Sequence, residues 1–194
     1  METPINKLLP KGERTCPWWL AYTFDNPLRR MLHDPEKIFA GLVGPGQTAI
    51  DIGCGMGYFT LGLARIVGPE GRVLAVDLQE KMLRRVKKRA ERAGLLSRIE
   101  PHQCGPDSLG INVQADFIIA FWMVHEVNRR DAFLREVHDL LKPGARFLVA
   151  EPVMHVSAAN LQKTVELARE SGLVAVDKPK IGWSRAVLFE RTRV

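Results

Sequence analysis

The chain has 194 residues, of which 46% are hydrophobic and 26% charged, and its formal net charge is +6. This length allows one domain with a buried core, and the composition is that of a globular protein rather than a disordered one. No apolar stretch reaches the roughly 20 residues of a membrane span, and the N-terminus lacks the apolar segment of a secretory signal. The cysteines, Cys16, Cys54 and Cys104, are odd in number and widely spaced. We therefore expect a reduced, cytoplasmic protein without a disulfide framework or a metal site.

Strand-like and helix-like segments alternate from residue 47 onward. Residue types and periodicity predict strands over 47–53, 72–77, 98–103, 115–123, 145–151, 173–179 and 185–192, with helices over 58–68, 78–94, 130–141 and 157–171. Nearly continuous apolar strands separated by helices are typical of an α/β protein whose parallel sheet is covered on both faces. The short loop around Gly182 suits an antiparallel pairing of the last two strands. We expect one domain over 38–194, with 1–37 as an N-terminal extension.

The stretch AIDIGCGMGYFT, which begins at residue 49, places Gly53, Gly55 and Gly57 directly after the first predicted strand. Ligands of such sheets bind at the carboxyl ends of the strands, where glycines let the backbone approach them. Tyr58 stands where the dinucleotide fingerprint needs its third glycine, and the phosphate-binding GK[ST] motif is absent from the sequence. Asp51 would repel a pyrophosphate by roughly 1–4 kcal/mol but attract an ammonium group. Its alternative role is to cap backbone amides of the loop.

A second carboxylate, Asp77, ends the strand predicted over 72–77, where it can accept hydrogen bonds from both hydroxyls of a ribose. A ribose without a phosphate, together with an amino acid, describes S-adenosylmethionine. The sequence resembles the class I S-adenosylmethionine-dependent methyltransferases over roughly 38–194, through the glycine stretch, VLAVDLQEKML, ADFIIAFWMVHEV and LLKPGARFLVAEP. Within that class it is most similar to the small-molecule branch that contains quinone-biosynthesis and arsenite methyltransferases.

The resemblance implies a Rossmann-like fold, with a seven-stranded, mostly parallel sheet, helices on both faces and an antiparallel C-terminal strand. It also implies that the glycine loop lines the methionine part of the cofactor, that Asp77 holds the ribose, and that Leu78 and Met82 lie against the adenine. The adenine amino group would meet the backbone at Cys104 and Gly105, or Asp107 if the alignment shifts by two. The expected S-adenosylmethionine contacts are Asp51, Gly53, Cys54, Gly55, Gly57, Asp77, Leu78, Met82, Cys104, Gly105 and Phe121.

Methyl transfer needs an aligned acceptor, and it needs a general base only where the acceptor loses a proton. Residues after the fourth and fifth strands are expected to face the acceptor: Trp122, His125, Glu126, Glu151 and His155. We assign His125 as a candidate base, with lining of the pocket as its alternative role. The aromatic N-terminal residues Trp18, Trp19 and Tyr22 are expected to contact the acceptor from a lid, or else to belong to a helix packed on the sheet edge.

The leading interpretation is an enzyme that methylates a small molecule. An RNA methyltransferase is the second, supported only by the predicted helix over 78–94, whose seven Lys and Arg residues outnumber two Glu. A non-catalytic S-adenosylmethionine-binding protein is the third, and arsenite binding by Cys16, Cys54 and Cys104 is a further alternative. We expect a small-molecule acceptor as partner, no nucleic acid, no membrane span, and a monomer or homodimer.

Overall fold

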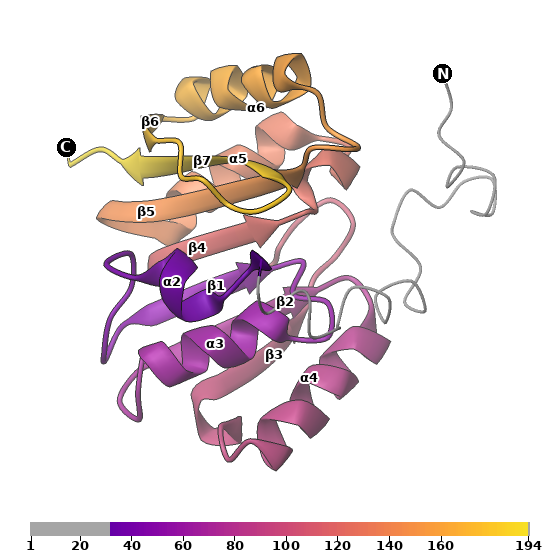
Figure 1. Ribbon diagram of the computed structural model, residues 1–194, viewed down its shortest axis with the longest axis vertical. Helices are drawn as coiled ribbons and strands as arrows, with labels where there is room; N and C mark the ends of the chain where they lie inside the picture. The colour runs from indigo at the N-terminus through magenta and orange to yellow at the C-terminus, as the bar shows by residue number, and fades with distance from the viewer. Residues whose placement is uncertain (1–31, 194) are drawn as a thin grey trace.

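The computed structural model describes residues 32–193, and within them it forms an α/β sandwich around a single sheet (Figure 1). The strands are β1 (Thr48–Ile52), β2 (Arg72–Asp77), β3 (Ile99–Gln103), β4 (Ala115–Phe121), β5 (Leu141–Pro152), β6 (Leu173–Asp177) and β7 (Ser184–Arg191). The α-helices are α2 (Pro35–Phe39), α3 (Tyr58–Ile66), α4 (Glu80–Arg92), α5 (Arg130–Leu140) and α6 (Ala158–Glu170), with short 3-10 turns η3 (Leu96–Arg98) and η4 (Val124–Glu126).

The seven strands lie in the order β3-β2-β1-β4-β5-β7-β6. The neighbours from β3 to β5 run parallel, and β7 is antiparallel to both β5 and β6. The chain order reverses between β1 and β4, so the carboxyl ends of these two strands flank the switch point where ligands of such sheets bind. The predicted seven-stranded, mostly parallel, Rossmann-like sheet with its antiparallel C-terminal strand is confirmed.

Alternate residues of each central strand supply two separate hydrophobic cores. In β1, for example, Ala49 packs in one core and Ile50 and Ile52 in the other. The first core contains residues of α2, α3 and α4, and the second contains residues of α5 and α6. Figure 1 shows α3 in front of the sheet and α5 behind it. Because both faces are covered, the central strands are nearly continuous apolar runs, which is the pattern that the sequence shows.

Several element ends differ by a few residues from the prediction, and two of these differences have a cause that the structure shows. β4 stops at Phe121 rather than continuing to residue 123, because Trp122 adopts a left-handed conformation with φ of 59°. β5 begins at Leu141, several residues before the predicted start, and it includes the Lys-Pro-Gly sequence that follows the helix predicted over 130–141. An irregularity in register between Ala115 and Phe117 on β4 accommodates these extra residues.

The described residues before β1 pack against the domain. Phe39 of α2 is fully buried, with its ring against Phe59 and Phe117. His33 is also buried, and its Nε2 lies 2.6 Å from the carbonyl oxygen of Gly182. Within residues 32–193, no helix has the length and apolar character that crossing a membrane requires.

Candidate active site

A cleft of about 660 Å³ opens at the carboxyl ends of the central strands. Such a volume is within the range of roughly 300–1,000 Å³ that small-molecule sites occupy. Its walls come from the loops after β1, β2, β3 and β4, together with the start of α5. The lining residues are Ile52, Gly53, Gly55, Asp77, Leu78, Gln79, Met82, Cys104, Gly105, Pro106, Asp107, Ser108, Leu109, Trp122, Met123, Glu126, Val127, Asn128, Arg129, Phe133 and Glu136.

The glycine loop forms the floor of this cleft. The backbone N–H groups of Gly53 and Cys54 both donate to the carbonyl oxygen of Val76, at 2.8 and 3.0 Å, which ties the loop to β2. A Cβ on Gly53 would lie 2.8 Å from Cγ of Met123, whereas a Cβ on Gly55 would meet nothing within 4 Å. The loop is therefore closed at Gly53 by the segment after β4 and open at Gly55, where a ligand can approach the backbone.

Asp77 holds the loop in place from the end of β2. Its carboxylate accepts hydrogen bonds from the backbone N–H groups of Gly55 (2.9 Å) and Gln79 (2.8 Å). Burial raises the pKa of this carboxyl above its usual value, while the bonds from Gln79 and Gly55 act in the opposite direction. Each carboxylate oxygen keeps acceptor capacity beyond its backbone bond. Asp77 lines the cleft, so its predicted contact with ribose hydroxyls is compatible with this geometry.

The predicted adenine-side residues come together on the neighbouring wall. Leu78 and Met82 lie after β2, and Cys104, Gly105 and Asp107 lie after β3, all lining the same cleft. Cys104 donates its backbone N–H to the carbonyl oxygen of Asp77, which joins the two loops. Burial, followed by the charge of Asp77, raises the pKa of the Cys104 thiol to about 11. This thiol is therefore protonated at neutral pH.

Four other predicted cofactor residues lie outside the lining of the cleft. Asp51 is buried and accepts a hydrogen bond from the Thr60 hydroxyl at 2.6 Å, which links β1 to α3. Cys54 and Phe121 are buried in the first core, and Gly57 is the N-terminal cap of α3. Burial raises the pKa of the Cys54 thiol well above its usual value. These positions favour support of the loop, and the predicted cofactor contacts of the four residues stay predictions.

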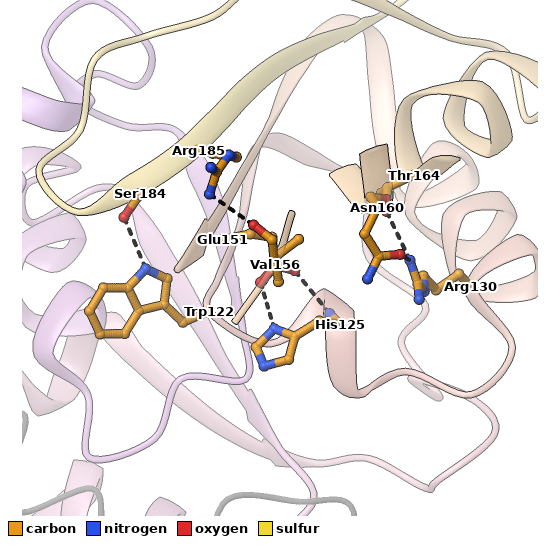
Figure 2. Close-up of polar contacts among 9 residues, drawn as sticks. All are labelled: Trp122, His125, Arg130, Glu151, Val156, Asn160, Thr164, Ser184 and Arg185. Carbon is orange, nitrogen blue, oxygen red and sulfur yellow. Dashed lines mark hydrogen bonds and ion pairs between the residues drawn. The ribbon is translucent and has the colours of Figure 1, made fainter. Parts of the chain in front are cut away.

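Trp122 lines the cleft and also contacts β7 and the segment before β1. Its indole Nε1 donates to the Ser184 hydroxyl at 2.9 Å (Figure 2). Its ring packs edge-on against the buried ring of His33, with centroids 5.2 Å apart, and lies tilted against Phe121. A bulky residue with positive φ is a strained conformation that surrounding contacts must hold. Trp122 thus lines the cleft in one fixed orientation.

His125 lies on η4 between the cleft-lining residues Met123 and Glu126, although it is not itself among the lining residues, and it is paired with a buried carboxylate. Glu151 at the end of β5 accepts from the His125 backbone N–H at 2.9 Å, and its other oxygen lies 2.6 Å from Nδ1 of the imidazole (Figure 2). The Glu151 side chain is 3% exposed and that of His125 is 24% exposed. Burial acts to lower the pKa of His125, but its hydrogen bond and charge interaction with Glu151 outweigh burial and raise it.

Of the other residues predicted to face the acceptor, His155 is described by the structure, and the N-terminal aromatic residues are not. His155 is exposed in the loop after β5, with its ring parallel to that of His125 at a centroid distance of 6.5 Å. Trp18, Trp19 and Tyr22, with the predicted lid and Cys16, lie outside the described residues. Among residues 32–193, no group of three or more His, Cys, Asp or Glu side chains is placed to hold a metal ion.

Sequence reasoning missed several lining residues, notably Met123, Arg129 and Glu136. Their position in the sequence could have indicated them. Met123 and Arg129 lie in the segment between β4 and α5, at the carboxyl edge of the sheet, and Glu136 lies on α5. His33 was missed for a different reason, since it belongs to the segment assigned as an extension. Its burial against Gly182 and Trp122 depends on contacts across the chain that local sequence does not show.

Comparison with known proteins gives the family of the chain. The family described as "Methyltransferase domain" matches residues 44–186, and the chain belongs to this family. The ubiquinone/menaquinone biosynthesis C-methyltransferase UbiE of Escherichia coli is 32% identical over 107 residues, which are 55% of this chain and 43% of that protein. The chain thus covers less than half the length of the curated relatives that it matches.

Two solved structures show the same fold at lower identity. A SAM-dependent methyltransferase from Aquifex aeolicus has a TM-score of 0.82 at 22% identity, covering 92% of this chain and 100% of that one. A putative S-adenosyl-L-methionine-dependent methyltransferase from Methanococcus maripaludis has a TM-score of 0.76 at 17% identity, covering 96% and 98%. Family and fold are those of the class I S-adenosylmethionine-dependent methyltransferases, which confirms the prediction from the sequence.

Proposed function

We propose that this protein transfers the methyl group of S-adenosylmethionine to a small-molecule acceptor at the cleft. The observation that carries the proposal is the position of Asp77, which lines the cleft beside the open glycine Gly55 and holds that loop by a backbone hydrogen bond. This arrangement offers a carboxylate to ribose hydroxyls and an exposed backbone to the group attached to the ribose. The UbiE relative, named as a C-methyltransferase of quinone biosynthesis, supports a small-molecule acceptor.

The charge of the cleft supports a cationic ligand. Among the described lining residues, Asp77, Asp107, Glu126 and Glu136 carry carboxylates, and Arg129 carries the guanidinium. The whole chain has a net charge of +6, so this excess of negative charge is local. S-adenosylmethionine carries a sulfonium and an ammonium against one carboxylate, and attraction between opposite charges favours it over a phosphate-bearing nucleotide. The residues present therefore fit this methyl donor.

When bound, S-adenosylmethionine supplies a methyl group on a sulfonium leaving group, so the protein has chiefly to align the acceptor. Alignment alone is worth up to roughly 7–11 kcal/mol. In this proposal the glycine loop, supported from β1 by Asp51, holds the methionine part. Asp77 holds the ribose, and the loops after β2 and β3 hold the adenine. Trp122, His125 and His155 face the acceptor, with Trp18, Trp19 and Tyr22 added from the N-terminal segment.

The RNA alternative depends on α4, whose exposed cations include Arg84, Lys87 and Lys88. The helix begins at the cleft, near Gln79 and Met82, and continues along the outside of the molecule (Figure 1). Its aliphatic side packs in the first core, as expected of an amphipathic surface helix. We propose a cytoplasmic protein, monomeric or homodimeric, without a nucleic-acid partner. Cys54 and Cys104 are both free thiols, which is compatible with a reducing compartment.

Incubation with isotope-labelled S-adenosylmethionine and a cell extract, followed by mass spectrometry, tests the proposal. We expect a labelled small molecule with the native protein. Asp77→Asn should weaken cofactor binding by roughly 10- to 150-fold, which corresponds to about 1.5–3 kcal/mol for a hydrogen bond to a charged group. Glu100→Gln is the matched control, because Glu100 is an exposed carboxylate on β3 outside the cleft lining.

Three results would contradict the proposal. Labelled RNA would point to the nucleic-acid alternative. Cofactor binding without any labelled product would favour a non-catalytic binding protein. Equal cofactor affinity of Asp77→Asn and the native protein would remove the assigned role of Asp77.

A further inference from the structure

The pairing of His125 with Glu151 gives the imidazole a defined protonation pattern. A carboxylate can only accept hydrogen bonds, so the 2.6 Å contact places a proton on Nδ1 of His125. In the neutral ring, Nε2 then carries the lone pair. The second oxygen of Glu151 accepts from the backbone N–H of His125, so both the ring and the backbone of this residue are held by one side chain.

Glu151 is suited to hold His125 in place because its carboxylate is buried, so water does not compete for its hydrogen bonds to His125. Its side chain is 3% exposed, at the end of a strand whose register with β7 fixes its position opposite Arg185. The guanidinium of Arg185 donates to the carbonyl oxygens of Val153 and Val156, both at 2.9 Å, and so ties the following loop to β7. Figure 2 shows Glu151 above the imidazole, with dashed lines to its ring and backbone nitrogens, and Arg185 reaching Val156.

His125 is not a lining residue of the cleft, but its position in the sequence places it at the border of the cleft. His125 lies between the cleft-lining residues Met123 and Glu126, and Met123 is the side chain packed on Gly53. Gly53 is the closed end of the loop, and Asp77 lies at its other end. With the ribose at Asp77, the methionine part of the donor extends toward Gly53 and Met123. With the donor placed in this way, His125 would border the end of the cleft at which the methyl group is presented.

We propose that His125 is the general base of the reaction, that Glu151 is its positioning residue, and that the acceptor is therefore a hydroxyl compound or a carbon acid. This inference rests on the transferase function proposed above. As the acceptor's oxygen or carbon bonds to the methyl carbon, the carbon–sulfur bond breaks and its electron pair stays on sulfur. The acceptor's proton passes to Nε2, and the imidazolium later releases it to water. A neutral amine that is methylated needs no base in this step, so the pair would have no role with such an acceptor.

Charged groups around His125 set the pH at which it works. Glu151 from β5 and Glu126 on its own turn raise its pKa, and burial and the guanidinium of Arg130 on α5 lower it. Asn160 and Thr164 of α6 accept hydrogen bonds from Arg130, which directs that charge toward α6 (Figure 2). His155 lies parallel to the imidazole on the remaining side. With a net raised pKa, activity should increase as pH rises through that value and His125 becomes neutral.

The test uses the full chain with S-adenosylmethionine carrying a ¹³C-methyl group and a metabolite extract as acceptor pool. Carbon NMR of the product identifies the methylated atom, which should be oxygen or carbon. His125→Asn should lower the turnover rate by about 10²–10⁴-fold, the usual contribution of a general base, with unchanged cofactor affinity. His125→Gln serves as the second variant if His125→Asn does not fold.

The matched control is His138→Asn. His138 on α5 also pairs through Nδ1 with a carboxylate, that of Asp139 at 3.0 Å, and its side chain is likewise 24% exposed. It is near Gly172, at the opposite end of α5 from the cleft. We expect the native turnover rate in His138→Asn.

Glu151→Gln separates positioning from a purely structural role. Glutamine has one acceptor oxygen where glutamate has two, so one of the two bonds to His125 is lost. If the amide N–H₂ faces Nδ1, the proton moves to Nε2 and the base is blocked. We expect the rise of turnover with pH to shift to lower pH and its plateau to fall. Nitrogen NMR of the imidazoles, assigned with His125→Asn, should show the Nδ1–H form at high pH in the native protein.

Several results would overturn the inference. Methylation of a nitrogen or sulfur atom, a His125→Asn variant as active as the native protein, or an Nε2–H form of native His125 would each do so while leaving the transferase function intact. Cofactor binding without any methylated product would instead overturn the transferase function, and this inference with it.

Discussion

Single residues of the glycine loop meet different constraints although their backbones are similar. Gly53 and Gly55 both have positive φ, of 70° and 53°. Of these two glycines, only Gly53 has another side chain at the place of a Cβ, since Cγ and Cβ of Met123 lie 2.8 and 3.0 Å from it. The loop therefore combines a packing requirement at one glycine with a requirement for open space at the other.

Replacing each glycine by alanine should separate these two effects. Gly55→Ala should cost about 1–2 kcal/mol for its left-handed conformation, and Gly53→Ala should cost that amount plus about 1–3 kcal/mol for overpacking against Met123. Urea unfolding of both variants measures the difference. The double variant Gly53→Ala/Met123→Ala should recover the overpacking term. Equal stability of Gly53→Ala and Gly55→Ala would show that Met123 moves aside without cost.

Pairs of elements are joined by buried contacts that are specific to this sequence. Asp51 on β1 and Thr60 on α3 are 2% and 0% exposed, and the Thr60 hydroxyl donates to the carboxylate at 2.6 Å. A buried carboxylate is costly unless donors surround it, so this bond fixes the rotation of α3 relative to the sheet. That rotation directs the N-terminus of α3, capped by Gly57, toward the loop.

Thr60→Val should therefore destabilise the protein more than Thr60→Ser. Valine has the shape of threonine but lacks the donor, and loss of a hydrogen bond to a charged group costs about 1.5–3 kcal/mol. Serine keeps the hydroxyl and loses a methyl group, which costs about 1 kcal/mol. Chemical denaturation of both variants compares them. A more stable valine variant would mean that Asp51 is satisfied without Thr60.

Helix α2 packs against α3 at a glycine. A Cβ on Gly62 would lie 2.3 Å from Cβ and 2.8 Å from Cγ of Pro35. Glycine within a helix is ordinarily unfavourable by about 1 kcal/mol relative to alanine. The close approach of α2 explains its presence at this position.

Gly62→Ala should consequently destabilise the protein, although the same change in an unconstrained helix stabilises it. We expect a net loss of about 1–2 kcal/mol, since overpacking outweighs the gain in helix propensity. In a Pro35→Gly background the clash is absent, and Gly62→Ala should be neutral or stabilising. The four unfolding midpoints form a double-mutant cycle. An increase in stability on changing Gly62 alone would disprove the packing argument.

At the scale of the whole molecule, the sequence allowed the fold and the cofactor side of the cleft to be predicted better than the acceptor side. Strand periodicity and strand ends place Gly53, Gly55 and Asp77 together because parallel strands share one carboxyl edge. The His125–Glu151 pair joins residues 26 positions apart. The geometry of this pair depends on β4 ending before Trp122, which has a left-handed backbone conformation that tryptophan rarely adopts and that local sequence does not predict. Contacts of His33 with Gly182 span 149 positions and are equally hidden from local patterns.

Cofactor binding should stabilise the whole molecule, because a ligand that binds only the folded state shifts the unfolding equilibrium. S-adenosylhomocysteine, the demethylated donor, at 100 times its dissociation constant should add about 2.7 kcal/mol. For a chain of this size that corresponds to a rise of roughly 5–11 °C in melting temperature. Glu100→Gln should keep this shift, and Asp77→Asn, with affinity weakened roughly 10- to 150-fold, should lose about half to nine-tenths of it at the same ligand concentration. Thermal scans over a ligand series measure the effect. A shift of native size in Asp77→Asn would show that the ligand binds without the carboxylate at the end of β2, and the cofactor would then have to be placed elsewhere on the sheet edge.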